Sequence, residues 1–342
     1  MKLARAIYSE EGRVILNKGI TLTQEYIKRL AALGISEIYI EDAISYDIEI
    51  HDIIHEQTRN EAKVIIKSIM ENCRKGIMYN LDHVKNIVNN ILDELLDNKD
   101  ILINLSDIKT MDDYTFSHSV NVCVLSVITG INLGLNQLKI RDLGVGALLH
   151  DVGKTLIPPE ILNKPSKLSE DEFEEIKKHT VLGYELLKKN IHISETSAYI
   201  ALAHHERYNG SGYPSCIEGG RIHLFARIVA IADVYDALTS DRVYRKKICV
   251  HEVVEHIMAL GKQHFDTDII QSFILNIAIY PEGTGVLLSN GCRGLVVKVM
   301  RHFPTRPVVR ILYDSSGNSI QEDEQINLTE VLNITIKNTC EI

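Results

Sequence analysis

The stretch His150-Asp151-Val152-Gly153-Lys154 places an imidazole, a carboxylate and an ammonium group within five positions. It follows an apolar run at 143–149, whose small and branched residues predict a tightly packed helix. Polar groups buried without partners are costly, so the protein must supply partners for these three. A metal ion is one solution, because histidine nitrogen and aspartate oxygen ligate first-row metals. A helix C-terminus is the alternative, since His and Lys complement the helix dipole there. The stretch alone does not decide between the two.

Composition limits the class of protein. The chain has 342 residues, enough for two or three domains, and its 45% hydrophobic and 24% charged residues are ordinary for a globular protein. A formal charge of −9 argues against DNA or RNA as a partner, although a local cationic cluster can still bind a small anion. The longest apolar runs fall short of the roughly 18 residues that cross a bilayer. The N-terminus lacks the apolar core of a signal peptide, so we expect a cytoplasmic protein. The six cysteines form no CxxC pair, which argues against a disulfide framework or a zinc ribbon.

The chain divides into four predicted parts. Residues 1–45 predict a small α+β module with a hairpin and one helix that begins after Thr23, followed by a strand at 36–40. Residues 46–100 predict a helical connector that could form a homodimer surface. Residues 101–278 predict a helical bundle with polar side chains at its centre. Residues 279–342 alternate β-branched runs with turn residues and predict a small β domain.

Seven metal-competent residues follow one another through the predicted bundle: His118, His150, Asp151, His179, His204, His205 and Asp233. Two octahedral ions bridged by a carboxylate and a water would use all of them. Each residue has a structural alternative, because a single His beside apolar residues is usually a hydrogen-bonded core residue and Asp233 could pair locally. Seven such coincidences in one helical segment are improbable. The sequence therefore predicts a dinuclear metal site.

The bundle resembles the HD-GYP phosphodiesterases, a branch of the HD metal-dependent phosphohydrolase superfamily. The resemblance covers residues 105–270, and its matching pieces are His118-Ser119, 150–154, 157–165, His179 with Gly183, 204–206, 210–214, 233–242 and Tyr244-Arg245. It implies a mainly α protein, with an HD-type helical bundle as catalytic domain between the two small end domains.

The resemblance implies hydrolysis of cyclic di-GMP to linear pGpG, which can be cut further to GMP. By motif position, one ion would be held by His118, His150, Asp151 and Asp233, and the second by His179, His204 and His205, with Asp151 bridging. The family implies iron or manganese, and a hydroxide bridging the two ions would attack the phosphodiester. A cyclic di-GMP sensor with little turnover and an HD-type nucleotidase are the alternative functions. Turnover assays on a substrate panel distinguish them.

Four further residues are candidate substrate contacts. Lys154 would neutralise phosphate charge, unless it only complements a helix end. Arg242 and Arg245 would hold the second phosphate or a guanine, unless they form a solvated basic surface. Tyr213, in the loop 210–214, offers a ring for stacking a base, while the resemblance also implies a contact between this loop and a diguanylate cyclase. A packed loop tyrosine is the structural alternative.

The sequence departs from the family pattern at two positions. Tyr114 stands where some members carry a glutamate for a third ion, so we expect two metals and not three. Asn209 replaces a common aspartate in the loop but removes no ligand. No receiver domain precedes the bundle in this sequence, so phosphorylation is not expected to regulate it.

Overall fold

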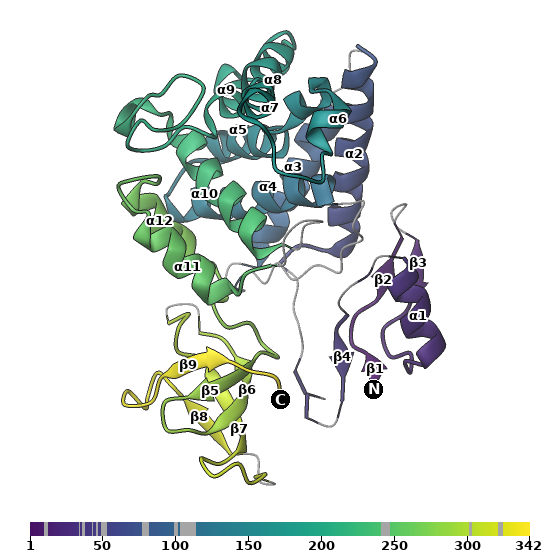
Figure 1. The fold of residues 1–342 in the computed structure, drawn as a ribbon, viewed down its shortest axis with the longest axis vertical. Coiled ribbons are helices and arrows are strands. Elements are labelled where there is room, and N and C mark those ends of the chain that lie inside the picture. Colours follow the sequence, from purple (N-terminus) through teal and green to yellow (C-terminus); the bar gives the residue numbers. More distant parts are fainter. Residues whose placement is uncertain are drawn as a thin grey trace.

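The computed structural model describes residues 1–9, 13–33, 35, 38–42, 44–45, 47–48, 53–76, 82–98, 102, 114–240, 247–300, 303–320 and 324–342. Helices dominate, and Figure 1 shows a large helical bundle with two small parts below it. One small part is the N-terminal α+β module and the other is a C-terminal sheet. The predicted mainly α fold class is therefore confirmed.

In the described residues of the N-terminal module there are two short antiparallel strand pairs and one helix. Its elements are β1 (Lys2–Leu3), β2 (Ile7–Tyr8), β3 (Val14–Leu16), α1 (Gln24–Ala32) and β4 (Ile40–Glu41), in which β1 pairs with β4 and β2 with β3. The predicted N-cap is present, because the Tyr26 backbone N–H donates to Thr23 Oγ1 at 3.2 Å. The strand predicted at 36–40 is paired at Ile40 and Glu41, while residues 36 and 37 lie outside the described residues.

The bundle comprises α2 (Glu56–Arg74), α3 (Asp82–Asp97), α4 (Tyr114–Asn132), α5 (Gln137–Leu148), α6 (Pro159–Leu162), α7 (Glu170–Lys177), α8 (His179–Lys188), α9 (Glu195–Ala203), α10 (Leu224–Thr239), α11 (Val250–Ala259) and α12 (Thr267–Ile274), with the 3-10 turns η2 (Val152–Leu156) and η3 (Gly219–Arg221). One apolar core runs through it from Ile53 to Ile279. Helices α2 and α3, predicted as a connector, contribute Ile66 and Val88 to this same core. The division of the chain into four parts stays a prediction.

Packing in the bundle brings the ends of several helices together. Helix α4 packs against α5 and α10, α5 packs against α9, and η2 packs against α8. The turns that follow α5 and α9 therefore lie near the start of α8. No helix among the described residues has both the length and the apolar character that a membrane span needs.

The C-terminal part is an antiparallel sheet with the strand order β8-β7-β6-β5-β9. Its strands are β5 (Gly285–Leu288), β6 (Arg293–Lys298), β7 (Val308–Tyr313), β8 (Gln325–Asn327) and β9 (Ile336–Thr339). It has a small core of its own around Val286, Val296 and Val309. The prediction of a small β domain here is confirmed.

Candidate metal centre

Asp151 lies between two groups of histidines and faces each group with a different carboxylate oxygen. Its Oδ1 is 3.6 Å from His179 Nε2 and 3.8 Å from His204 Nε2. Its Oδ2 is 3.4 Å from His150 Nε2 and 3.9 Å from His118 Nε2. A carboxylate in this position can bind two ions at once, one through each oxygen.

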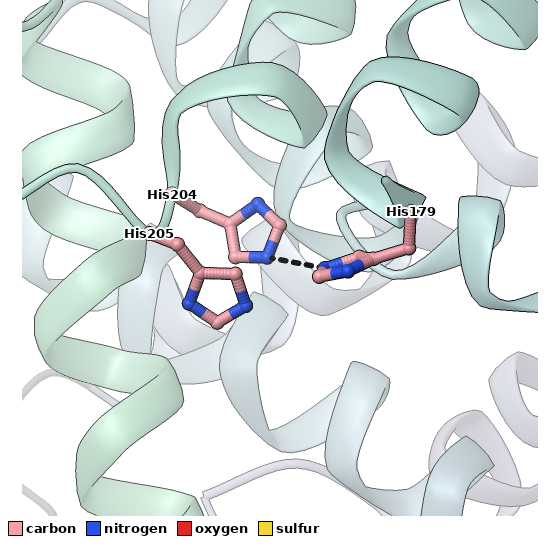
Figure 2. A group of neighbouring side chains, drawn as sticks. All are labelled: His179, His204 and His205. Carbon is pink, nitrogen blue, oxygen red and sulfur yellow. Dashed lines mark hydrogen bonds between the residues drawn. The ribbon is translucent and has the colours of Figure 1, made fainter. Parts of the chain in front are cut away.

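The two groups satisfy the spacing that a metal ion requires. One group is His179, His204 and His205, and the other is His118, His150 and Asp151. Within each group the potential ligand atoms lie within 4.8 Å of one another. Figure 2 shows the three rings of the first group converging, with His179 Nε2 and His204 Nε2 3.5 Å apart.

Asp233, on α10, connects the two groups from another side. Its Oδ1 is 3.1 Å from His118 Nε2, and its Oδ2 is 3.8 Å from His205 Nδ1. All seven residues that the sequence singled out as ligands are therefore neighbours in space. They come from α4, α8, α10 and the turns after α5 and α9.

Backbone carbonyls fix the orientation of three histidine rings. Nδ1 of His150 contacts Ala147 O at 2.8 Å, and Nδ1 of His179 contacts Ile176 O at 2.6 Å. Nδ1 of His204 lies 3.0 Å from two carbonyl oxygens of α9. Because a carbonyl only accepts, each Nδ1 must donate, and each Nε2 keeps its lone pair for the centre of the site.

Unmet hydrogen-bonding capacity at the centre supports a cation. Among the described residues, His150 Nε2 and Asp151 Oδ1 are buried without a hydrogen-bond partner. A native protein rarely leaves such atoms unsatisfied. Imidazole nitrogens and carboxylate oxygens together form a donor set that divalent metal ions accept. The residues present therefore fit divalent metal ions.

The pKa values of the ligands also favour metal binding. Burial lowers the pKa of His150 and His179, lowers that of His204 well below its usual value, and lowers that of His205 to about 3. Burial alone would raise the pKa of Asp151, but the Lys154 charge and the nearby histidines hold it well below normal. These four rings are thus neutral and the carboxylate is ionised at neutral pH, as metal ligands must be.

His118 differs from the other histidines. Burial favours its neutral form, but its hydrogen bonds with Asp233 and Asp236 outweigh this effect and raise its pKa to about 9. Without metal, this ring stores a proton that shields the two carboxylates from each other. An ion ligated by His118 Nε2 has to displace that proton.

Two glycines allow the backbone to bring Asp151 beside His179. A Cβ on Gly153 would lie 1.9 Å from the His179 carbonyl oxygen and 2.6 Å from Gly183 N. Only a residue without a side chain lets η2 touch the start of α8 this closely. The close contact between Gly153 and Gly183 thus allows η2, which follows Asp151, to pack directly against α8, which begins at His179.

The loop after His205 lies against the centre. The Tyr213 ring lies against the His205 ring in a tilted arrangement, with centroids 4.7 Å apart and an angle of 31° between the planes. The buried Glu206 carboxylate accepts backbone hydrogen bonds from Ser215 at 2.7 Å and Ile217 at 3.2 Å, which holds the loop in place. Lys177, from α7, lies over the Tyr213 ring at 5.5 Å. The Tyr213 ring and the Lys177 ammonium group therefore lie beside the candidate ligand His205.

Lys154 is a partly exposed neighbour of the candidate ligands. Its Nζ is 2.5 Å from Asp151 Oδ2, and its side chain is 30% exposed. It can therefore reach a bound anion while it stays next to the ligands. Arg242 and Arg245 lie outside the described residues.

Three buried residues behind His118 were not predicted from the sequence as part of the site. Asp236 accepts from His118 Nδ1 at 2.7 Å and from Asn121 Nδ2 at 2.7 Å, and Arg59 Nη1 donates to Asn121 Oδ1 at 2.8 Å. One signal was available, because Arg59 precedes Ala62 by three residues and Ile66 by seven, which places it on the apolar stripe of α2.

Comparison with known proteins identifies the family. A model of the HD domain matches residues 97–269, about half of the chain, and a model of the KOW domain associated with the HD domain matches residues 285–342. The chain therefore belongs to the HD domain family, and the resemblance drawn from its motifs is confirmed.

Individual relatives agree with this assignment. A cyclic di-GMP phosphodiesterase of Pseudomonas aeruginosa is 35% identical over 75% of this chain and 62% of its own length. The cyclic di-GMP phosphodiesterase response regulator RpfG of Xanthomonas campestris is 43% identical over 42% of this chain and 38% of its own length. The chain thus matches less than two thirds of either relative. Among solved structures, an HDG"Y"P protein from Bdellovibrio bacteriovorus has the same fold, with a TM-score of 0.50 and 20% identity over 80% of this chain and 94% of that one.

Proposed function

We propose that this protein is a metal-dependent phosphodiesterase that hydrolyses cyclic di-GMP to linear pGpG. One observation carries the proposal, namely the Asp151 carboxylate placed between two histidine groups so that each oxygen faces one of them. The names of the relatives from Pseudomonas and Xanthomonas support cyclic di-GMP as the substrate. A second cut to GMP would use the same site.

The proposed ligand sets follow the two groups. His118, His150, Asp151 and Asp233 hold one ion, and His179, His204 and His205 hold the other, with Asp151 shared. The spacing and the unsatisfied buried atoms support this assignment. Iron or manganese fits the donor set best. When bound, such ions supply a nucleophilic hydroxide at neutral pH and cationic charge for the phosphate oxygens.

The residues of the chain orient the substrate and neutralise its charge. Lys154 places a partly exposed ammonium group beside Asp151, where it can contact a phosphate oxygen as negative charge develops. Tyr213 is assigned to stacking of a guanine, because its ring lies beside the candidate ligand His205. Arg242 and Arg245 remain candidates for the second phosphate. Contact with a cyclase through the loop, and a homodimer, stay predictions.

The test is turnover by protein purified and loaded with iron or manganese under anaerobic conditions. Cyclic di-GMP, a mixed cyclic dinucleotide, pGpG and a mononucleotide are each supplied, and the products are separated by chromatography. We expect pGpG from cyclic di-GMP. Binding of cyclic di-GMP by fully loaded protein without product would indicate a sensor, and hydrolysis of the mononucleotide alone would indicate a nucleotidase. Either result refutes the proposal.

A further inference from the structure

A chain of buried polar side chains runs from the back of the metal centre to helix α2. His118 lies on α4, and its Nδ1 contacts Asp236 of α10 at 2.7 Å. The other oxygen of Asp236 accepts from Asn121 of α4 at 2.7 Å. Asn121 in turn accepts from Arg59 of α2 at 2.8 Å. Each side chain is 3% exposed or less.

The direction of each hydrogen bond in this chain is fixed by chemistry. A guanidinium only donates, so Arg59 makes the amide oxygen of Asn121 the acceptor. The amide NH₂ of Asn121 must then point to Asp236 and donate to its Oδ1. Asp236 consequently presents Oδ2 to His118, which donates from Nδ1 and keeps Nε2 toward Asp151 and Asp233. Arg59 thus fixes the orientation of the Asn121 amide, which donates to the same carboxylate that accepts from His118.

Helix α2 lies outside the residues matched by the HD domain model, which begins at residue 97. It nevertheless packs against α4, which carries His118, and against η2, which carries Lys154. A buried arginine on its apolar stripe costs stability unless its donors are used. One of its donors, Nη1, is used by Asn121, which lies next to the His118–Asp236 pair.

We propose that Arg59 is a positioning residue for the half of the metal centre that contains His118, so that α2 belongs to the metal site in function. The inference rests on the proposed metal binding. It assigns Arg59 an effect mainly on one ion of the two, because His118 is the first candidate ligand that the hydrogen bonds from Arg59 reach, through Asn121 and Asp236.

The experiment measures binding of Mn²⁺ alone to the full chain after treatment with a chelator, by calorimetry and by electron paramagnetic resonance. The unsubstituted protein should bind two ions. Arg59→Met should lower the affinity for one ion by about 10- to 100-fold and leave the affinity for the other unchanged, as expected when a residue that orients a ligand is lost. Arg74→Met, at the exposed end of the same helix, should bind both ions as the unsubstituted protein does.

A second background identifies the ion that is affected. His118→Gln should still bind the ion held by His179, His204 and His205. Adding Arg59→Met to this variant should not lower the affinity for that ion further. If Arg59→Met lowers the affinity for both ions equally, or for neither, the inference is overturned. If Arg59→Met does not fold, Arg59→Lys decides, because it keeps the buried cation but not the planar fork. A smaller loss at one ion supports the inference, and unchanged binding overturns it. Failure of the unsubstituted protein to bind Mn²⁺ would instead refute the proposed metal centre.

Discussion

Asp151 lies between the two histidine groups of the proposed metal centre. Asp151→Ala should remove both bound ions and reduce hydrolysis to background, because one side chain faces both histidine groups. Metal content by mass spectrometry and pGpG production measure the two effects. Asp171→Ala, at an exposed position of α7, is the control and should change neither. Retention of two ions by the Asp151 variant would contradict the assignment.

Lys154 should affect the rate but not metal retention. It is not among the predicted ligands, and its partly exposed ammonium group can reach a substrate phosphate. We expect Lys154→Ala to keep both ions and to lose on the order of 100-fold in kcat, comparable to the loss of one preorganised donor. Steady-state kinetics on metal-loaded protein give the value. An unchanged kcat would mean that the lysine only balances the charge of Asp151.

The neutral histidines should make the metal-free protein sensitive to acid. The pKa of His205 is lowered from 6.5 to about 3, and those of His150, His179 and His204 are lowered as well. Below 6.5 the unfolded chain therefore binds more protons than the folded one, so the free energy of unfolding falls as the pH falls from 6.5 toward 3. Each histidine contributes up to about 1.4 kcal/mol per pH unit.

His118 acts in the opposite direction, because its pKa is raised to about 9. Its contribution to stability is complete below 6.5 and is lost as the pH rises through 9. Urea unfolding of chelator-treated protein at several pH values measures both trends. His205→Gln should reduce the slope of the free energy of unfolding against pH, between pH 6.5 and 3, by the equivalent of about one bound proton. A free energy of unfolding that does not change between pH 7 and pH 4 would contradict this account.

The contact between η2 and α8 brings Asp151 close to His179. Gly153→Ala would place a Cβ against the His179 carbonyl, so η2 and α8 must separate. We expect weaker metal binding and a loss of about 1–3 kcal/mol in the free energy of unfolding, typical of overpacking. Gly220→Ala is a matched control, because a Cβ there meets no atom within 4 Å. Equal stability and metal binding in the two variants would contradict a packing role for Gly153.

The candidate ligands can be predicted from the sequence more easily than the residues that form hydrogen bonds with them. The candidate ligands stand in recognisable local patterns, such as 150–154 and 204–206, so they can be found without a structure. The partners behind them cannot, because Asp236 is 118 residues from His118 and Arg59 is 62 residues from Asn121. Which helix face meets which is decided by packing across the whole core. A polar residue on an apolar stripe, such as Arg59, is the local trace of such a contact.

At the scale of the whole molecule, buried or half-buried ion pairs connect the small end parts to the rest of the chain. Arg5 of the N-terminal module pairs with Glu56 at the start of α2 at 2.7 Å. This contact lies three residues before Arg59, so the module touches the helix that we propose to support His118. The sequence could not predict it, since a surface arginine and a helix-start glutamate have many equivalent partners.

The C-terminal sheet is connected to the segment before α2 through Arg310. Its guanidinium donates to both carboxylate oxygens of Asp47, at 2.9 and 2.5 Å, and to the Ile44 carbonyl at 3.0 Å. The Arg310 side chain is 9% exposed and that of Asp47 is 41% exposed, so solvent screens part of the attraction. A coupling of about 1 kcal/mol is the expected size for such a pair.

We therefore expect Arg310→Met to remove the contact between the sheet and Asp47 without lowering the affinity for either metal ion, because the sheet has a core separate from that of the bundle. Hydrogen exchange should increase in β7 and at residues 44–45 and 47–48, while Mn²⁺ affinity stays the same. Lys337→Met, at an exposed position of β9, is the control for loss of a charge on the same sheet. A double-mutant cycle with Asp47→Asn isolates the pair, since both single variants should cost as much as the double variant if the two residues act only through each other. Weaker Mn²⁺ binding in Arg310→Met would show instead that the sheet acts on the metal centre.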